Sequence, residues 1–269
     1  MKKLILSGWN GRMGKSVSLA APEYGFRTVA GIGHGAKEAN GTVTFPVYAH
    51  TADCRERADC VIDFSSPSFL PELLAFADKS HTPLVIGTTG YSEEEKAKIE
   101  EFSHRVPVFC SPNLSFGIGV LQKLCRTLPS LLGQEFDIEM TEIHHKNKKD
   151  APSGTALLLA KALAHGRTAA IGFGRKGEKV RERGEICLHS VRGGGVIGEH
   201  CVYFLGEDEV LTLTHSALDR SLFAKGALRA AAFLIGKPAG FYDMDALIEA
   251  TLLQNVPQRD EKNGIFSFL

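Results

Sequence analysis

The sequence has no excess charge of either sign and no long apolar run. Lys plus Arg number 31 in the 269 residues, as do Asp plus Glu, so the formal net charge is zero. A chain that binds nucleic acid or an acidic membrane surface usually carries a net positive charge, so this balance argues against both kinds of partner. No stretch approaches the roughly 20 apolar residues that a membrane span needs. Any positively charged binding surface must therefore be confined to one region of the protein.

Paired cysteines are also missing. The six cysteines are scattered, and no two of them form a C-x-x-C motif. This pattern is typical of a reduced compartment and argues against a disulfide framework. The apolar run Leu4–Leu6 is too short for a signal peptide. We therefore expect a soluble, cytoplasmic protein, long enough for one large or two modest domains.

The first recognisable unit is a strand, a glycine turn and a helix. Leu4–Leu6 is apolar, Gly8–Gly14 carries three glycines, and Lys15–Ala21 has helical character. Glycines at such a turn let the backbone approach a pyrophosphate, whose charge then lies at the helix N-terminus. Asn10 stands where the usual fingerprint has its middle glycine, and asparagine tolerates left-handed backbone. The alternative is an ordinary tight turn.

The end of the second predicted strand bears on the choice of cofactor. Strand Arg27–Ile32 should end near a carboxylate that binds the ribose hydroxyls of NAD. Here Gly33 and His34 follow instead, and the next acid is Glu38. With Arg12 and Lys37 nearby, this arrangement favours the 2′-phosphate of NADP. It leaves NADH open.

Further strands and helices alternate through the first half of the chain. Such repetition predicts an α/β fold with a Rossmann-type, doubly wound parallel sheet. Ser92 and Glu95 form a capping box at the start of one of these helices. The predicted segments are a strand at 58–67 that leaves the sheet at a serine turn, a helix at 69–79, a strand at 83–86, a helix to about Arg105 and a strand at 106–110.

The second half has a different pattern, in which strands follow one another. It predicts a smaller α+β domain with a mixed or antiparallel sheet packed by helices. The predicted strands are 136–143, 185–191, 201–205 and 209–215. The predicted helices are 120–131, 156–163, 220–235 and 243–252.

A polar stretch at 142–156 joins a predicted strand to a predicted helix. It contains two imidazoles and three lysines, and either Asp150 or Ser153 can cap the helix. A helix N-terminus attracts anions, and nearby lysines add to that attraction. The alternatives are a solvated loop or a metal site. His144 and His145 point to opposite sides of a strand, which argues against a shared metal. We predict a site for an anionic small molecule, with groups that can transfer a proton.

This stretch resembles a known signature. Glu142-Ile-His-His, followed by Lys148 and then Asp150-Ala-Pro-Ser-Gly-Thr-Ala, closely resembles that of the dihydrodipicolinate reductase (4-hydroxy-tetrahydrodipicolinate reductase) family of the diaminopimelate route to lysine. The resemblance implies NAD(P)H-dependent reduction of a cyclic dicarboxylate. It also implies that His144 and Lys148 donate the proton. In the same way it assigns the substrate carboxylates to His145, Lys148, Gly154 and Thr155. Because the nearest cysteines, Cys125 and Cys187, lie in no metal-like spacing, we expect no metal.

The resemblance extends to the predicted cofactor loops, which include the family's G-x-x-G-R-M-G and G-T-T-G patterns. It implies NADPH and/or NADH as cofactor. The residues that it assigns to the cofactor, together with His34, are Gly8, Asn10, Gly11, Arg12, Met13, Gly14, Gly87, Thr88, Thr89, Ser111, Pro112, Asn113 and Leu114. The segment 192–200 resembles a family segment that borders the substrate site.

The resemblance also implies a domain organisation. Residues 1–115, with a C-terminal return at 221–269, would bind the dinucleotide, and residues 116–220 would bind substrate and form a homotetramer. The resemblance to the family ends near Leu252. Two other functions stay open: a nicotinamide dehydrogenase acting on another small acid, and a regulator that senses NAD(P)H without turnover.

Overall fold

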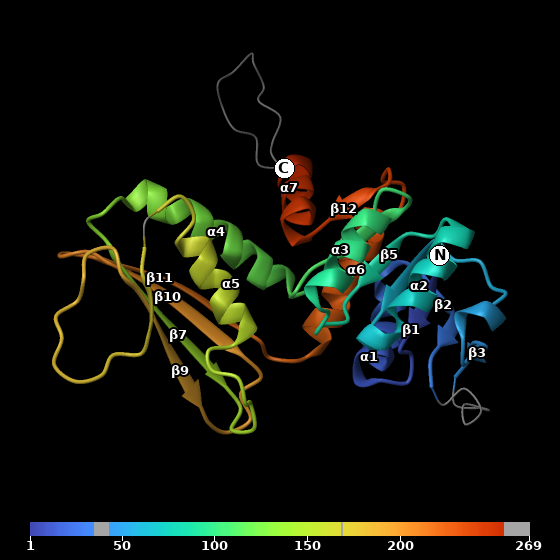
Figure 1. Cartoon of the computed structure of the whole chain (residues 1–269), viewed down its shortest axis with the longest axis horizontal. Coiled ribbons are helices and arrows are strands. Elements are labelled where there is room, and N and C mark those ends of the chain that lie inside the picture. The colour runs from blue at the N-terminus through green and yellow to red at the C-terminus, as the bar shows by residue number, and fades with distance from the viewer. Residues whose placement is uncertain (35–42, 168, 256–269) are drawn as a thin grey trace, which may run out of the picture. The chain divides into compact units, whose positions relative to one another are not determined.

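The computed structural model describes residues 1–34, 43–167 and 169–255 (Figure 1). Within it the chain divides into two compact units. Unit 1 comprises Met1–Ser111 and the chain from Ala227 onward, and unit 2 comprises Pro112–Gly226. Unit 2 is therefore an insertion into unit 1. The expectation for the tail after Leu252 falls largely on residues outside the described ranges.

Unit 1 contains a parallel sheet. Its described strands have the order β12-β6-β5-β4-β1-β2-β3, and every neighbouring pair is parallel. The order changes direction between β1 and β4, as it does in doubly wound folds. The predicted fold class is thus confirmed. The strands are β1 Lys2–Ser7, β2 Phe26–Ile32, β3 Val47–Tyr48, β4 Cys60–Asp63, β5 Leu84–Ile86, β6 Pro107–Cys110 and β12 Gly240–Tyr242.

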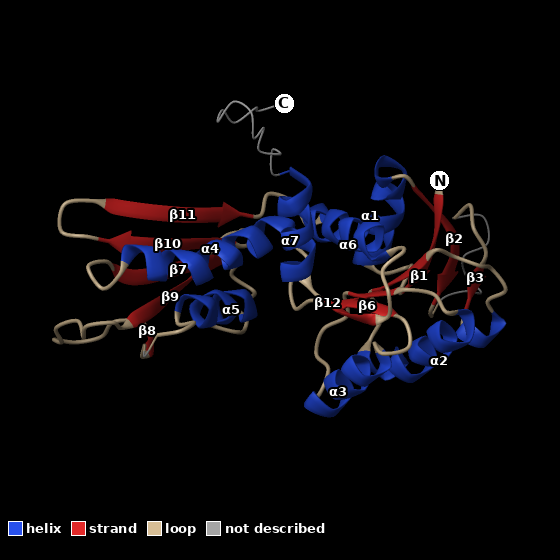
Figure 2. Cartoon of the chain, turned by 90° about the horizontal axis from the view of Figure 1, so that it is seen from above, coloured by secondary structure: helices blue, strands red, loops and turns tan. Residues whose placement is uncertain are grey.

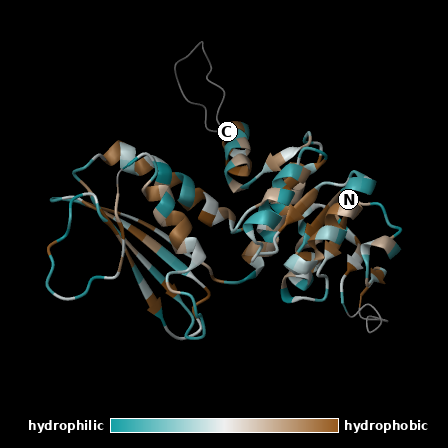
Figure 3. Cartoon of the chain, viewed as in Figure 1, coloured by the Kyte–Doolittle hydropathy of each residue, from teal (hydrophilic) through white to brown (hydrophobic). Residues whose placement is uncertain are grey.

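Helices cover both faces of this sheet, with α2 and α3 on one face and α1 and α6 on the other (Figure 2). Buried side chains of the central strands form the core, and these strands are brown in Figure 3. No described helix is long and apolar enough to cross a membrane. The helices of unit 1 are α1 Arg12–Ala20, α2 Leu70–Ser80, α3 Glu93–Phe102 and α7 Met244–Asn255, and α6 Ser221–Leu234 leads into it from unit 2.

Unit 2 contains a mixed sheet, as predicted, with the order β11-β10-β7-β9-β8. The central strand β7 is antiparallel to β10 and parallel to β9. Helices α4 and α5 both lie on one face of this sheet (Figures 1 and 2). The elements are α4 Phe116–Leu132, β7 Asp137–His144, α5 Gly154–Leu163, β8 Ile171–Phe173, β9 Ile186–Arg192, β10 Glu199–Leu205 and β11 Val210–Ser216.

The alternation along β7 places the polar site. Ile138, Met140, Glu142 and His144 are all buried, while the residues between them are more exposed. Because strand side chains alternate between faces, these four residues point to the side covered by α4 and α5. The apolar row of the core thus continues into a carboxylate and an imidazole at the end of the strand.

The sequence-based boundaries need correction at several places. Three strands were missed, β3, β8 and β12, because two or three residues are too short to show a period. Helix α4 begins at Phe116 rather than Val120, since the Ser115 hydroxyl accepts a hydrogen bond from the amide of Ile118 at 3.2 Å. Helix α1 begins at Arg12 rather than Lys15.

The two ends of unit 2 touch one another. A Cβ atom on Gly226 would lie 1.7 Å from the carbonyl oxygen of Leu114, so only glycine fits at this position. The entry and exit segments of the inserted unit are therefore in direct contact.

Candidate active site

The site in unit 2 is built on the connection from β7 to α5. Of the two possible caps, Ser153 is the one used: its hydroxyl accepts from the amide of Ala156 at 3.1 Å. Asp150 instead forms an ion pair with Lys148, with 2.9 Å between Nζ and Oδ1. The Ala151–Pro152 peptide is cis. The first amides of α5, those of Gly154 and Thr155, have no partner within the helix.

Glu142 is the central acceptor of the site. Its carboxylate is fully buried, and the oxygen Oε2 forms a hydrogen bond with Nδ1 of His144. The other oxygen, Oε1, accepts from Nη2 of Arg192 at 2.7 Å and from the amide of Ser153 at 3.3 Å. Burial alone would raise the pKa of Glu142, but hydrogen bonds from Arg192, Ser190 and His144 outweigh it and lower the pKa. Glu142 is therefore a carboxylate that ties β7, β9 and the start of α5 together.

The imidazole of His144 is fixed from several sides. Burial lowers its pKa, and Lys148 and Arg192 add to this effect, whereas Glu142 raises it; the net shift is downward. Because Glu142 occupies Nδ1, the group left for chemistry is Nε2. A Cβ atom on Gly198 would lie 3.0 Å from Nε2, so glycine keeps this side of the ring open.

His200 packs against His144, with ring centroids 5.3 Å apart and the planes nearly perpendicular. Burial lowers the pKa of His200 to about 4, and the neighbouring His144 adds to this. It is therefore a neutral imidazole at physiological pH. Its Nε2 lies 3.3 Å from the Ser153 hydroxyl. Its Nδ1 is buried without a hydrogen-bond partner among the described residues.

Donor atoms of Glu142, His144 and His200 lie within 4.8 Å of one another, a spacing that a metal could use. However, the Glu142 carboxylate and Nδ1 of His144 already form a hydrogen bond with each other, and Arg192 compensates the carboxylate charge. The donor set is therefore used by a hydrogen-bond network, and we assign no metal to it.

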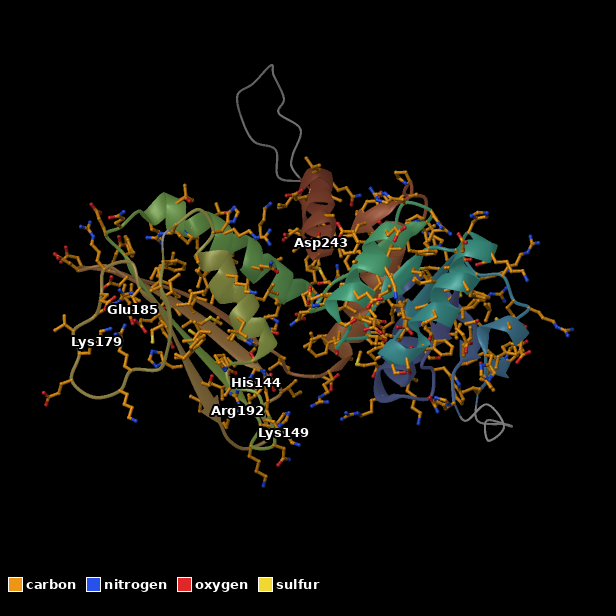
Figure 4. All side chains as sticks on the ribbon, viewed as in Figure 1. His144, Lys149, Lys179, Glu185, Arg192 and Asp243 are labelled. Carbon is orange, nitrogen blue, oxygen red and sulfur yellow. The ribbon has the colours of Figure 1, made fainter. Side chains whose placement is uncertain are left out.

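One lysine lies beside this network and two others lie in the same loop. Lys148 is 21% exposed and close enough to His144 to lower its pKa, whereas Lys146 and Lys149 are exposed. Figure 4 labels His144 and Arg192 at one end of the sheet, where they are register partners in β7 and β9. Positive groups and a helix N-terminus thus meet beside one imidazole, which is a suitable environment for a small anion.

The glycine turn of unit 1 has the tight geometry that a dinucleotide cradle needs. Gly8 has φ +76°, and a Cβ there would lie 2.3 Å from the carbonyl oxygen of Phe64. Gly11 is the N-cap of α1 and offers no side-chain cap, so the first amides of the helix stay open to a ligand. A Cβ on Gly14 would lie 2.4 Å from the carbonyl oxygen of Gly8. These features fit a pyrophosphate at the N-terminus of α1.

Two family models match nearly the whole chain. Residues 2–114 match the N-terminus of dihydrodipicolinate reductase, and residues 117–248 match its C-terminus. The chain belongs to the dihydrodipicolinate reductase family.

Curated relatives agree with this assignment. The 4-hydroxy-tetrahydrodipicolinate reductase of Clostridium novyi (strain NT) is 42% identical over 253 residues, covering 93% of this chain and 99% of the relative. That of Caldanaerobacter subterraneus subsp. tengcongensis is 45% identical over 254 residues, with the same coverage. A solved dihydrodipicolinate reductase from Paenisporosarcina sp. TG-14, bound to dipicolinate, has a TM-score of 0.74 at 24% identity, covering 90% of this chain and 97% of that one, and supports the fold. Membership of this reductase family implies a nicotinamide cofactor.

The residues predicted from the family signature fall into two groups. In unit 1, Gly8–Gly14, His34 and Gly87–Thr89 all follow the carboxyl ends of parallel strands, and the side-chain amide of Asn10 donates to the carbonyl oxygen of His34 at 2.8 Å. Ser111 is the last residue of the first segment of unit 1. In unit 2, the side-chain amide of Asn113 donates a hydrogen bond to the Thr155 hydroxyl at 2.9 Å. This bond joins a predicted cofactor residue to a predicted substrate residue.

Three residues of the network had no predicted role. Glu142 was part of the signature, and Arg192 and His200 were part of the segment expected to border the substrate site, but none was selected individually. The available signal was the alternation of β7, which continues inward through Glu142 to His144. The Arg192 and His200 contacts depend on strand pairing over about 50 residues, which one sequence does not reveal.

Gly14→Ala tests the packing of the glycine turn. The added methyl would meet backbone atoms of Gly8 and Trp9, which cannot rotate away. We expect a loss of about 1–3 kcal/mol in the free energy of unfolding, as is typical of overpacking, together with weaker nucleotide binding. Urea unfolding followed by circular dichroism measures the first effect. Lys15→Ala, an exposed position in the same helix, is the control, and equal stability of the two variants would contradict the close-approach argument.

Proposed function

We propose that the protein reduces 4-hydroxy-tetrahydrodipicolinate (dihydrodipicolinate) to tetrahydrodipicolinate, with NADPH or NADH, in the diaminopimelate route to lysine. The observation that carries the proposal is the buried His144, held by Glu142 beside Lys148 and the open N-terminus of α5. A nicotinamide supplies a hydride when bound. The protein must then bind the dicarboxylate, orient its ring and provide a proton.

The proposed division of labour follows the two units. Residues 1–115 with the return at 221–269 would bind the nucleotide, which the glycine turn at the N-terminus of α1 supports. Residues 116–220 would bind the substrate. The cofactor residues proposed in unit 1 are Gly8, Asn10, Gly11, Arg12, Met13, Gly14, His34, Gly87, Thr88, Thr89 and Ser111, and Pro112, Asn113 and Leu114 would complete the set.

Carboxylate binding is proposed for four residues near the start of α5. The amides of Gly154 and Thr155 can donate to one carboxylate, because they lack partners within the helix. His145 and Lys148 supply side-chain donors. A dianionic substrate would also compensate the positive charge of Lys148 and its neighbours.

Proton delivery is proposed for His144 together with Lys148. Nδ1 of His144 is held by Glu142, so the proton would leave from Nε2. Burial and the nearby cations lower the pKa of His144 in the free protein. An anionic substrate beside it would raise that pKa again, so that binding itself favours the protonated, proton-donating form.

Preference for NADPH is the finer proposal on the cofactor. Arg12 is exposed at the start of α1, and His34 follows the end of β2, so both can reach a 2′-phosphate. Arg12→Ala should then raise the KM for NADPH more than that for NADH.

One assay tests the activity and the cofactor together. Absorbance of NADPH and NADH is followed in parallel, with substrate made in place by the upstream synthase from pyruvate and aspartate semialdehyde. Synthase-dependent oxidation supports the reductase, and the ratio of the two rates gives the preference. Nucleotide binding without oxidation would favour a sensing protein, and oxidation with another small acid alone would favour a different dehydrogenase.

We propose a homotetramer formed through unit 2. Helices α4 and α5 lie on one face of its sheet, and no described helix covers the other face, where Tyr203 and Thr141 lie. Exposed valines, Val191 and Val210, lie at this face or its edges. Light scattering should give four times the chain mass, and a monomer would contradict the proposal.

A cytoplasmic location is proposed as well. All six cysteines are free thiols, as is usual in a reduced compartment. Fractionation of cells that express the native chain tests this.

A further inference from the structure

Asp63 is the last residue of β4 and lies where the order of the parallel sheet changes direction. In the register of the sheet it is the partner of Ser7 in β1 and of Ile86 in β5. From this point β1 continues outward to β2 and β3, and β4 continues to β5 and β6. Ligands of open parallel sheets bind in the crevice outside the carboxyl ends of the strands at this position.

The Asp63 carboxylate holds two loops at once. Oδ1 accepts from the hydroxyl of Ser65 at 2.6 Å and from its amide at 3.2 Å. Oδ2 accepts from the hydroxyl of Thr88 at 2.5 Å. The main chain adds a further link, since the Gly87 amide donates to the carbonyl oxygen of Asp63 at 2.8 Å. The loop after β4 and the loop after β5 are therefore fastened to one side chain.

A buried carboxylate such as that of Asp63 lowers the stability of the fold. Asp63 is fully buried, and burial raises its pKa, while hydrogen bonds from Ser65 and Thr88 oppose that rise. The hydrogen-bond donors named above are hydroxyl and amide groups, which compensate a buried charge less well than a cation does. An apolar residue would close the same space at lower cost, so the carboxylate indicates a need for fixed loop geometry.

The geometry points to Asp63 as a positioning residue for the nucleotide. It holds the Thr88 hydroxyl, so that Thr88 is half-buried while the next residue, Thr89, is exposed. It fixes the Ser65 loop beside the glycine turn of β1 in the same way. This inference rests on the proposed function, because it assigns the nicotinamide dinucleotide as the ligand that these loops receive.

The experiment measures binding of NADPH and NADH by the fluorescence of Trp9, the single tryptophan, which lies within the glycine turn. Asp63→Asn should weaken binding of both nucleotides by about tenfold or more, the size of one hydrogen bond to a charged group. The KM for substrate at saturating nucleotide should stay near that of the wild type. The matched control is Asp59→Asn, at the amino end of the same strand, where the carboxylate accepts from the Lys3 amide at 2.7 Å.

A second pair of variants separates loop positioning from general stability. Thr88→Val removes the hydroxyl that Asp63 accepts, and Thr88→Ser keeps it, so the serine variant should bind more tightly than the valine variant. If Asp63→Asn does not fold, the two Thr88 variants still test whether Asp63 positions the loop. Equal binding by the valine and serine variants would overturn the inference, as would wild-type affinity in Asp63→Asn. If the wild type binds neither nucleotide, the proposed function itself fails.

Discussion

Lys148→Ala is expected to lower turnover at least about 100-fold, the usual size of a lost general acid. Lys148 is only 21% exposed, is ion-paired with Asp150 and lies close enough to His144 to affect its pKa. Its ammonium can therefore serve both the proton transfer and the substrate carboxylates. The measurement is kcat in the synthase-coupled assay at saturating nucleotide and substrate.

The control for this experiment is in the same loop. Lys149→Ala removes an equal charge from the next residue, which is exposed. We expect turnover in this variant to stay within about twofold of the wild type, since exposed charges contribute little. Near-normal turnover in Lys148→Ala would remove Lys148 from the mechanism. A rise in KM at unchanged kcat would restrict it to carboxylate binding.

Glu142→Gln is expected to lower kcat by about 100-fold while the chain still folds. The amide keeps the shape of the side chain but cannot stabilise an imidazolium, and it allows the other neutral tautomer of His144. The pH profile gives a sharper readout. A general acid must be protonated, so kcat/KM should fall as pH rises through a pKa below the ordinary histidine value. Since Glu142 raises the pKa of His144, the variant should shift this fall to still lower pH.

A purely structural role of Glu142 would give a different result. Such a role would lower the melting temperature without moving the apparent pKa of kcat/KM. Asp137→Asn is the matched control, because it removes an exposed acid at the other end of the same strand, where it pairs with Arg181 at 3.2 Å. An unchanged pH profile in Glu142→Gln would contradict the proposed coupling between the carboxylate and His144.

The sequence predicts the elements of the site better than its internal contacts. The capping box at Ser92 and Glu95, the alternating strand β7 and the glycine turn all depend on residues within a few positions of one another. Local periodicity and capping chemistry determine such features, so they can be read from one sequence. The fold class followed from the order of the predicted elements, although strands β3, β8 and β12 were missed.

The parts that were missed depend on distant residues. Glu142 meets Arg192 only because β7 and β9 pair in a register that places His144 beside Arg192. Asp63 meets Thr88 across 25 residues, through the pairing of β4 with β5. Strand register depends on how whole strands pack against each other, so local patterns in one sequence do not reveal which distant residues become partners. The sequence therefore shows that Glu142 and Asp63 are acidic, but it does not show which residues they contact.

The contact between Leu114 and Gly226 has a consequence for how this architecture can arise. Because Leu114 and Gly226, near the two ends of the inserted unit, touch, joining this unit to a host chain requires almost no additional loop closure, and the entropy cost of insertion is small. Domain insertions are tolerated where chain ends lie close together. Residues 112–226 therefore leave and re-enter unit 1 at nearly one place, as a unit inserted as a single block would.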